Sequence, residues 1–162
     1  MSGADPRAFR DAIGRFPTGV TVVTTLGPDG PAGLTTNAVT SLSLDPLLLL
    51  VCFDNGSRTL PAVRSSERFG VNVLASDQGE IARVFASKAV AAEKFAAVTH
   101  VEEHGVPVLD GAAAWIACSL RELLPGGDHT IGIGEVLGTH VAVERAPLVF
   151  ADGAYRVLAP DT

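Results

Sequence analysis

The sequence feature that most constrains the fold is a succession of short strand-like segments separated by turn residues. The segments are rich in β-branched or alternating apolar residues, and the breaks are rich in Gly, Pro, Asp and Asn. The predicted strands are Val20 to Leu26, Leu34 to Leu44, Leu47 to Phe53, Phe69 to Leu74, Trp115 to Leu124, Thr130 to Glu144, Leu148 to Phe150 and Tyr155 to Leu158. Such strands with few long helices predict a mainly β fold, a barrel or a sandwich.

Helical signals are confined to short stretches. An apolar stripe at helical spacing consists of Phe9, Ala12, Ile13 and Phe16. It follows Asp5 and Pro6, which suit the start of a helix. Further helices are expected at residues 59–66 and 78–86, with a helix and then a loop at 88–98. Residues 27–30 form a turn by composition, so the flanking strands should form a hairpin.

Composition narrows the function classes. The chain has 162 residues, which we expect to form one domain, residues 1–162, with a real core. A hydrophobic fraction of 47% and a charged fraction of 19% argue against extensive disorder and are compatible with a buried subunit interface. The net charge of −6, without any basic cluster, argues against a nucleic-acid partner.

The location predicted from the sequence is the cytoplasm. The chain does not open on a secretory leader, and its longest apolar run, Leu47 to Phe53, is too short to span a bilayer. That run, apolar throughout, predicts a central strand covered on both faces. Cys52 and Cys118 lie far apart in apolar segments, which is typical of buried free thiols.

The segment from Gly33 to Pro46 carries unusually many small polar side chains. They are Thr35, Thr36, Asn37, Thr40, Ser41 and Ser43. An ordinary edge strand would carry Lys and Glu instead. A strand lined with small hydrogen-bonding groups lets a flat polar ligand lie against it. A Thr-rich strand with solvated hydroxyls is the structural alternative.

Two further polar clusters lie in loops. Residues 54–59 follow a strand and precede a helix, and they combine turn backbone N–H groups, the hydroxyls of Ser57 and Thr59 and the cation of Arg58. These groups could bind a phosphate, although a capped helix start has the same residues. Residues 126–130 form a flexible turn that presents His129, either to a ligand or simply to solvent.

Two apparent motifs do not support a site. Residues 100–104 read His-Val-Glu-Glu-His, the pattern of inverted zinc proteases, but that chemistry needs a helix. Gly105 and Pro107 follow, so we expect a polar loop and no metal. Gly132, Gly134 and Gly138 fail the dinucleotide fingerprint; they should let a barrel strand bend or a ligand approach.

The clusters together resemble the flavin reductase family of the FMN-binding split barrel, the reductase partners of two-component flavin monooxygenases. The matching residues run nearly end to end: Phe9-Arg10, Phe16 to Val20, Gly33 to Ala38, Thr40 to Pro46, Ser57 to Thr59, Phe69 to Leu74, Lys94-Phe95, Gly127 to His129 and Gly134 to Val136. The resemblance implies a Greek-key split β-barrel with short helices, and a homodimer that holds FMN or FAD near the subunit interface. It also implies reduction of the flavin by NADH or NADPH and its transfer to a partner monooxygenase.

The resemblance also implies roles for individual residues. Those expected along the ribityl chain and ring are Thr35, Thr36, Asn37, Ala38, Ser41, Leu42 and Ser43. Cys52, Phe53 and Asp54 would lie beside the isoalloxazine, Ser57, Arg58 and Thr59 at the phosphate, and Phe85 and Ala86 near the flavin tail. His129, the expected catalytic-site residue, would lie where the nicotinamide enters, on the side faced by Phe150, Gly153 and Tyr155.

Gly132 departs from the family pattern, because many relatives carry a larger apolar residue there. We expect a wider slot at this position, which would change how the nicotinamide or adenine stacks. The chemistry itself would come from the cofactors, since hydride passes from nicotinamide to flavin N5 without a protein base, metal or nucleophile. A non-catalytic flavin storage or sensing protein is the nearer alternative, and a structural interaction module the more distant one.

Overall fold

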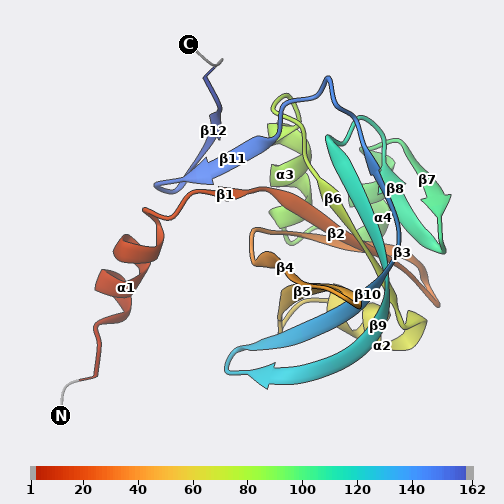
Figure 1. The fold of residues 1–162 in the computed structure, drawn as a ribbon, viewed down its shortest axis with the longest axis horizontal. Coiled ribbons are helices and arrows are strands. Elements are labelled where there is room, and N and C mark those ends of the chain that lie inside the picture. Colours follow the sequence, from red (N-terminus) through yellow and green to blue (C-terminus); the bar gives the residue numbers. More distant parts are fainter. Residues whose placement is uncertain (1–2, 160–162) are drawn as a thin grey trace.

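The computed structural model describes residues 3–159 and is mainly β with short helices, as the sequence predicts (Figure 1). The principal sheet has seven antiparallel strands in the order β3-β2-β6-β9-β10-β5-β4. Their bounds are β2 (Thr21–Gly27), β3 (Gly30–Thr36), β4 (Val39–Leu44), β5 (Leu47–Asp54), β6 (Arg68–Val73), β9 (Ala114–Gly126) and β10 (His129–Val141). No helix within residues 3–159 is long and apolar enough to cross a membrane.

Smaller elements flank this sheet. Three strands form a second sheet, β1 (Thr18–Gly19), β11 (Leu148–Ala151) and β12 (Ala154–Val157), and two form a hairpin, β7 (His100–Glu103) and β8 (Val106–Leu109). The helices are α1 (Pro6–Ile13), α2 (Thr59–Ser66), α3 (Gly79–Ala86) and α4 (Ala91–Ala96). The predicted helix at 59–66 is confirmed at both ends. The predicted polar loop at 100–104 is wrong, because residues 100–103 pair with β8.

The strand predicted from Leu34 to Leu44 is in fact two strands, which break at Asn37 and Ala38. β3 and β4 lie at opposite edges of the seven-stranded sheet. In a flat sheet these edges would be roughly 29 Å apart, whereas the link from Thr36 to Val39 spans at most about 11 Å. The sheet must therefore curl until its edges approach, which produces a split barrel.

The strand from Leu47 was predicted to be covered on both faces, and this is wrong within one chain. β5 is second from a sheet edge, and its exposure alternates along the strand. Leu49, Val51 and Phe53 point into the barrel and are buried, while the intervening side chains are only partly covered. The outward apolar residues of β5 therefore form a surface that the chain itself covers only in part.

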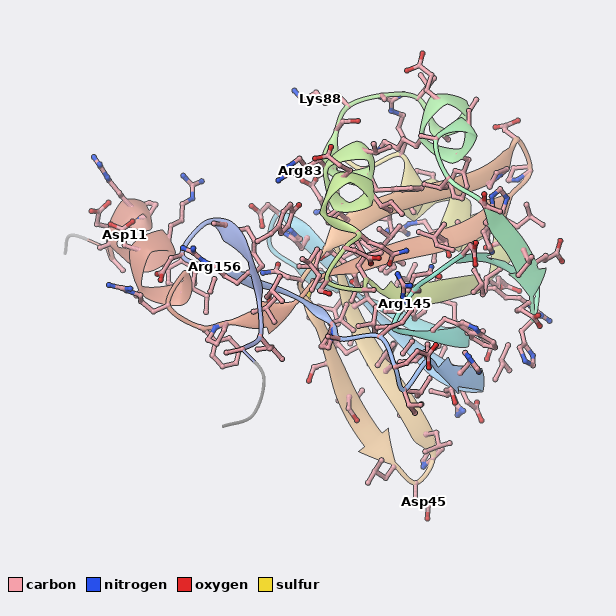
Figure 2. All side chains as sticks on the ribbon, turned by 90° about the horizontal axis from the view of Figure 1, so that it is seen from above. Asp11, Asp45, Arg83, Lys88, Arg145 and Arg156 are labelled. Atoms are coloured by element: carbon pink, nitrogen blue, oxygen red, sulfur yellow. The ribbon has the colours of Figure 1, made fainter. Side chains whose placement is uncertain are left out.

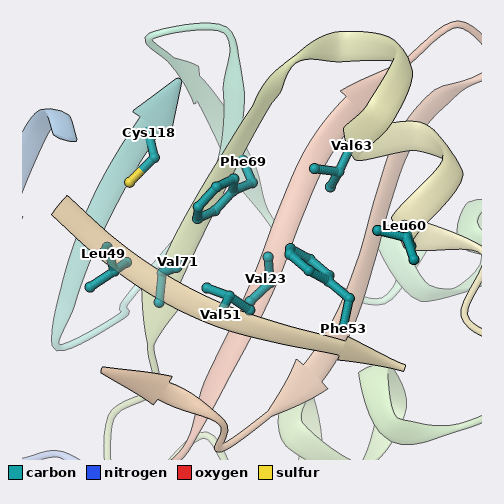
Figure 3. Packing of buried hydrophobic residues seen from close by; sticks show 9 residues of the cluster. All are labelled: Val23, Leu49, Val51, Phe53, Leu60, Val63, Phe69, Val71 and Cys118. Carbon is teal, nitrogen blue, oxygen red and sulfur yellow. The ribbon is translucent and has the colours of Figure 1, made fainter. Parts of the chain in front are cut away.

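The barrel interior is filled by nine apolar residues from strands and α2 (Figure 3): Val23, Leu49, Val51, Phe53, Leu60, Val63, Phe69, Val71 and Cys118. The rings of Phe53 and Phe69 meet edge to face, with centroids 6.0 Å apart. Burial raises the pKa of the Cys118 thiol to about 12, so this cysteine stays protonated. The prediction of a buried thiol is confirmed for Cys118, while Cys52 is half-buried.

Gly132 belongs to this core rather than to a ligand slot. A Cβ at this position would lie 2.7 Å from the ring of Phe53. The expected wider slot is therefore wrong, because the missing side chain is replaced by an aromatic ring of the same chain. The β9–β10 register shifts beside Gly134 and Gly138, where the predicted bending of the strand is confirmed.

Helix α1 stands away from the barrel (Figures 1 and 2). Asp5 caps it as predicted, and Arg15 anchors its far end through an ion pair with Asp152 at 3.1 Å. None of its residues is buried, and the large apolar side chains of its stripe, Phe9, Ile13 and Phe16, are 53–67% exposed. An apolar stripe this exposed calls for a partner surface outside the chain.

Candidate functional site

A surface cleft of about 710 Å³ brings together residues from three parts of the sequence. Its floor is the β2–β3 hairpin, one wall is the β5–α2 loop with the start of α2, and the other is the end of α3 with the start of α4. The predicted site residues that line it are Thr35, Asp54, Ser57, Arg58, Thr59, Phe85 and Ala86. The volume falls within the range of small-molecule sites.

The β5–α2 loop is held by its own polar groups. Asp54 Oδ1 accepts a hydrogen bond from the Gly56 N–H at 2.6 Å, and Ser57 Oγ accepts one from the Leu60 N–H at 3.2 Å. The Ser57 hydroxyl thus satisfies a donor in the first turn of α2, as the capped-helix interpretation requires. Arg58 Nη2 donates to the Lys88 carbonyl at 2.6 Å, which ties this wall to the opposite one.

The turn that carries His129 is joined to this loop. The Asn55 N–H donates to the Asp128 carbonyl at 3.1 Å, and its side chain contacts both the Gly127 carbonyl and Thr130 Oγ1. The β5–β10 register places His129 directly opposite Asp54, which lines the cleft. Two clusters more than 70 residues apart therefore form one unit, although His129 itself lies just outside the cleft.

The His129 imidazole is oriented by its neighbour. Its Nδ1 lies 2.7 Å from Asp128 Oδ1, and the His129 side chain is 42% exposed. The side-chain hydrogen bond with His129, and then the charge of His129, lower the pKa of the Asp128 carboxyl. The ring therefore has a preferred direction, and its Nε2 remains for a ligand.

Several of the small polar residues after Gly33 form hydrogen bonds within the chain, which we had not expected. Thr35 Oγ1 donates to the Ala82 carbonyl at 2.7 Å, Thr36 Oγ1 accepts from the Ala38 N–H at 3.1 Å, and Ser43 Oγ accepts from the Asp45 N–H at 3.2 Å. Asn37, Ser41 and Leu42 are exposed at or beside β4. Asn37, Ser41 and Leu42 therefore lie at the sheet edge, outside the lining of the cleft.

Some of the residues that were predicted to contact a ligand are only partly accessible to one. Phe53 is fully buried in the barrel, so only its backbone can face a flavin, whereas Cys52 points outward and is half-buried. Phe150 and Tyr155 pack against each other, with centroids 5.8 Å apart, and Arg83 of α3 lies over the Tyr155 ring. Their hairpin, with Gly153 at its turn, lies far from the β9–β10 turn in Figure 1. One chain alone does not bring it to His129.

Sequence reasoning missed two lysines in the cleft wall, Lys88 and Lys94. The Lys94 side chain is buried, and its Nζ donates to the Phe85 carbonyl at 2.9 Å. Burial, and then the charge of Arg58, lower the pKa of Lys94. Lys94 belongs to one of the matching family segments, but nothing local shows that an Ala-rich helix buries its lysine.

Comparison with known proteins identifies the family. The model of the flavin reductase like domain matches residues 13–159. The chain belongs to this flavin reductase family. The predicted family and its split-barrel fold are thereby confirmed, as is the predicted activity, NAD(P)H-dependent reduction of a flavin.

The relatives agree over most of the chain. A probable flavin reductase of Rhizobium meliloti is 46% identical over 134 residues, which are 82% of this chain and 42% of that longer protein. The reductase subunit HsaB of a flavin-dependent monooxygenase of Mycobacterium tuberculosis is 39% identical, covering 97% of this chain and 84% of its own. The NADH:FAD oxidoreductase SgcE6 of Streptomyces globisporus, solved with NAD and FAD fragments, superposes with a TM-score of 0.90 at 37% identity and covers 99% of both chains.

Proposed function

We propose that this flavin reductase transfers hydride from NADH to FAD and delivers the reduced FAD to a separate monooxygenase component. The observation that carries the proposal is the cleft, whose wall at Ser57 and Arg58 is joined to the His129 turn by the hydrogen bonds of Asn55. These hydrogen bonds support a phosphate site and a nicotinamide site that are held next to each other. A relative named as a monooxygenase reductase subunit supports the delivery step.

The extent of the cleft favours FAD over FMN. The lining of the cleft also includes Pro61, Ala62 and the β2–β3 turn at residues 27–30. This part is lined mainly by backbone, proline and alanine, a surface suited to a flat purine. FMN would end at Arg58 and leave this end of the cleft empty. The similar SgcE6 is named as an NADH:FAD oxidoreductase, which points the same way.

The residues present fit a flavin phosphate. Within residues 3–159, Arg58 has no carboxylate partner, and its recorded contact is the Lys88 carbonyl. A guanidinium that has spare donors and no counter-ion is suited to an anionic group. Flavin and nicotinamide supply the hydride chemistry when they are bound. The chain holds the phosphate at Arg58, presents the β3–β4 residues to the ring system and orients the nicotinamide at His129.

The proposed working form is a cytoplasmic homodimer of single-domain chains. The exposed stripe of α1, the outward face of β5 and the projecting β4–β5 hairpin, tipped by Asp45 in Figure 2, are the surfaces we assign to the second copy. A second copy could also bring Phe150 and Tyr155 toward the nicotinamide side, which one chain does not do. The free cysteines fit a reducing compartment.

Anaerobic mixing of the purified chain with NADH and FAD tests the function. We expect loss of NADH absorbance together with bleaching of the long-wavelength flavin band. A metal chelator should have no effect on the rate. Turnover should be faster with FAD than with FMN, and faster with NADH than with NADPH. Flavin that binds but is not bleached by either nicotinamide would instead identify a storage or sensing protein.

A further inference from the structure

Lys94 is a buried cation in the cleft wall that lacks a carboxylate partner. The residue is 8% exposed, and no Asp or Glu of residues 3–159 forms an ion pair with it. Lysines this deeply buried are normally paired, because an unpaired charge is costly to remove from water. The buried ammonium of Lys94 has therefore lost water contacts without gaining a counter-ion.

The surroundings of Lys94 increase this cost. The charge of Arg58 acts on Lys94 and, after burial, is the second cause that lowers its pKa. The cleft is lined by three cations, Arg58, Lys88 and Lys94, and by two carboxylates, Asp29 and Asp54. Asp54 already accepts from the Gly56 N–H. In a chain with a net charge of −6, this cleft therefore has a local excess of positive charge.

The contact that Lys94 makes uses only one of its donors. Its Nζ donates to the Phe85 carbonyl at 2.9 Å, which satisfies one carbonyl at the end of α3. A neutral donor would also satisfy that carbonyl, although a cation is favoured at the end of a helix. An ammonium has three donors, and two remain for the cleft that Lys94 lines.

We propose that Lys94 binds the second phosphate of FAD, while Arg58 binds the phosphate nearer the flavin, so that Lys94 is the residue by which the chain distinguishes FAD from FMN. The proposal rests on the proposed function. Arg58 comes from the β5–α2 loop beside the His129 turn, and Lys94 comes from α4 on the opposite wall. Two cations from opposite walls of one cleft match the two linked phosphates of a dinucleotide, whereas FMN offers a single phosphate.

The test compares Lys94→Met with the unaltered chain in fluorescence titrations with FAD, FMN and riboflavin. We expect the affinity for FAD to fall about tenfold or more, as for a lost charge-assisted contact, and the affinity for FMN by less than about threefold. Lys94→Arg should restore most of the FAD affinity. The matched control is Arg64→Met, which removes an exposed cation of α2 that does not line the cleft and should leave the FAD-to-FMN ratio unchanged.

The thermal unfolding temperature of the flavin-free variants separates binding from folding. Because Lys94→Met removes an uncompensated buried charge, we expect it to leave that temperature unchanged or to raise it. A lowered temperature with equal losses for FAD and FMN, or an unchanged FAD affinity, would overturn the proposal; Lys94→Gln repeats the test if the Met variant does not fold. Absence of NADH oxidation by the unaltered chain would contradict the proposed function instead, whatever the titrations show.

Discussion

At the scale of single residues, Arg58 combines a structural contact with a predicted ligand contact. Its guanidinium donates to the Lys88 carbonyl on the opposite wall, and Arg58 also lines the cleft in which we propose that a flavin phosphate binds. A single planar side chain can perform both tasks because its donors point in several fixed directions.

Arg58→Ala should weaken binding of FMN and FAD by about one to two decades, since a charge-assisted phosphate contact contributes roughly 1.5 to 3 kcal/mol. Riboflavin has no phosphate and should bind the variant almost as it binds the unaltered chain. Fluorescence titration with each flavin measures this. An equal loss for riboflavin would show that Arg58 acts only by holding the two walls together.

His129 is positioned by polar contacts on both sides of its strand. Its imidazole bonds Asp128, and its backbone lies opposite Asp54. His129→Ala should raise the Michaelis constant for the nicotinamide by roughly tenfold, about 1.4 kcal/mol, because a binding contact is lost and hydride transfer needs no acid. Flavin affinity should stay within about twofold.

Steady-state turnover and flavin titration of the same His129→Ala preparation check this pair of expectations. Loss of flavin binding with unchanged nicotinamide kinetics would place His129 on the flavin side. No change in either would leave it as a solvated turn residue.

At the scale of elements, β10 shows how a glycine can be required by packing alone. The space above Gly132 is filled by the ring of Phe53, which comes from the neighbouring strand β5. Gly132→Ala should lower the free energy of unfolding by about 1 to 3 kcal/mol, because the added methyl overpacks the core.

Chemical denaturation measures the effect of Gly132→Ala, and Gly19→Ala is the matched control, since a Cβ at Gly19 meets nothing within 4 Å. The preference between NADH and NADPH should be the same in the Gly132 variant as in the unaltered chain. A changed preference without loss of stability would restore the idea of a slot at this position.

Helix α1 gains little stability from packing against its own chain. Eight residues form a marginal helix in water, and none of its side chains is buried. Ile13→Glu should therefore dissociate the proposed dimer, because the charge would be buried against the second copy. Sedimentation velocity measures the dissociation, with Arg7→Glu on the opposite face of the helix as control. If the unaltered chain binds flavin as a monomer, the proposed dimer is contradicted.

At the scale of the whole molecule, the link between β3 and β4 determines the shape. Only Asn37 and Ala38 separate two strands that lie at opposite edges of one sheet. The Ala38 carbonyl accepts a hydrogen bond from the Cys52 N–H at 2.9 Å, which holds the link against β5. Closure of the barrel therefore places the hydroxyl-rich segment on both sides of the split, near the end of the sheet where β5 leads into the cleft.

The sequence by itself determined the order and type of most elements. Alternation, β-branched residues and turn residues are local signals, and they predicted α2 to the residue, the β2–β3 and β11–β12 hairpins, and the three polar clusters. The family followed from the same clusters. The misplaced features, the continuous strand through Asn37 and the loop at residues 100–104, depend on pairing with distant segments, which local patterns do not record.

Tertiary structure alone decided which polar groups meet. Asn55 joins two loops that are remote in sequence, Phe53 fills the space of Gly132, and Lys94 is buried beside Arg58. Each of these facts depends on the closure of the barrel and the packing of α3 and α4, so no window of sequence contains it. The sequence shows which residue types line the cleft. Their distances, burial and unpaired charge arise only when the sheet curls, because electrostatic and packing energies depend on spatial neighbours.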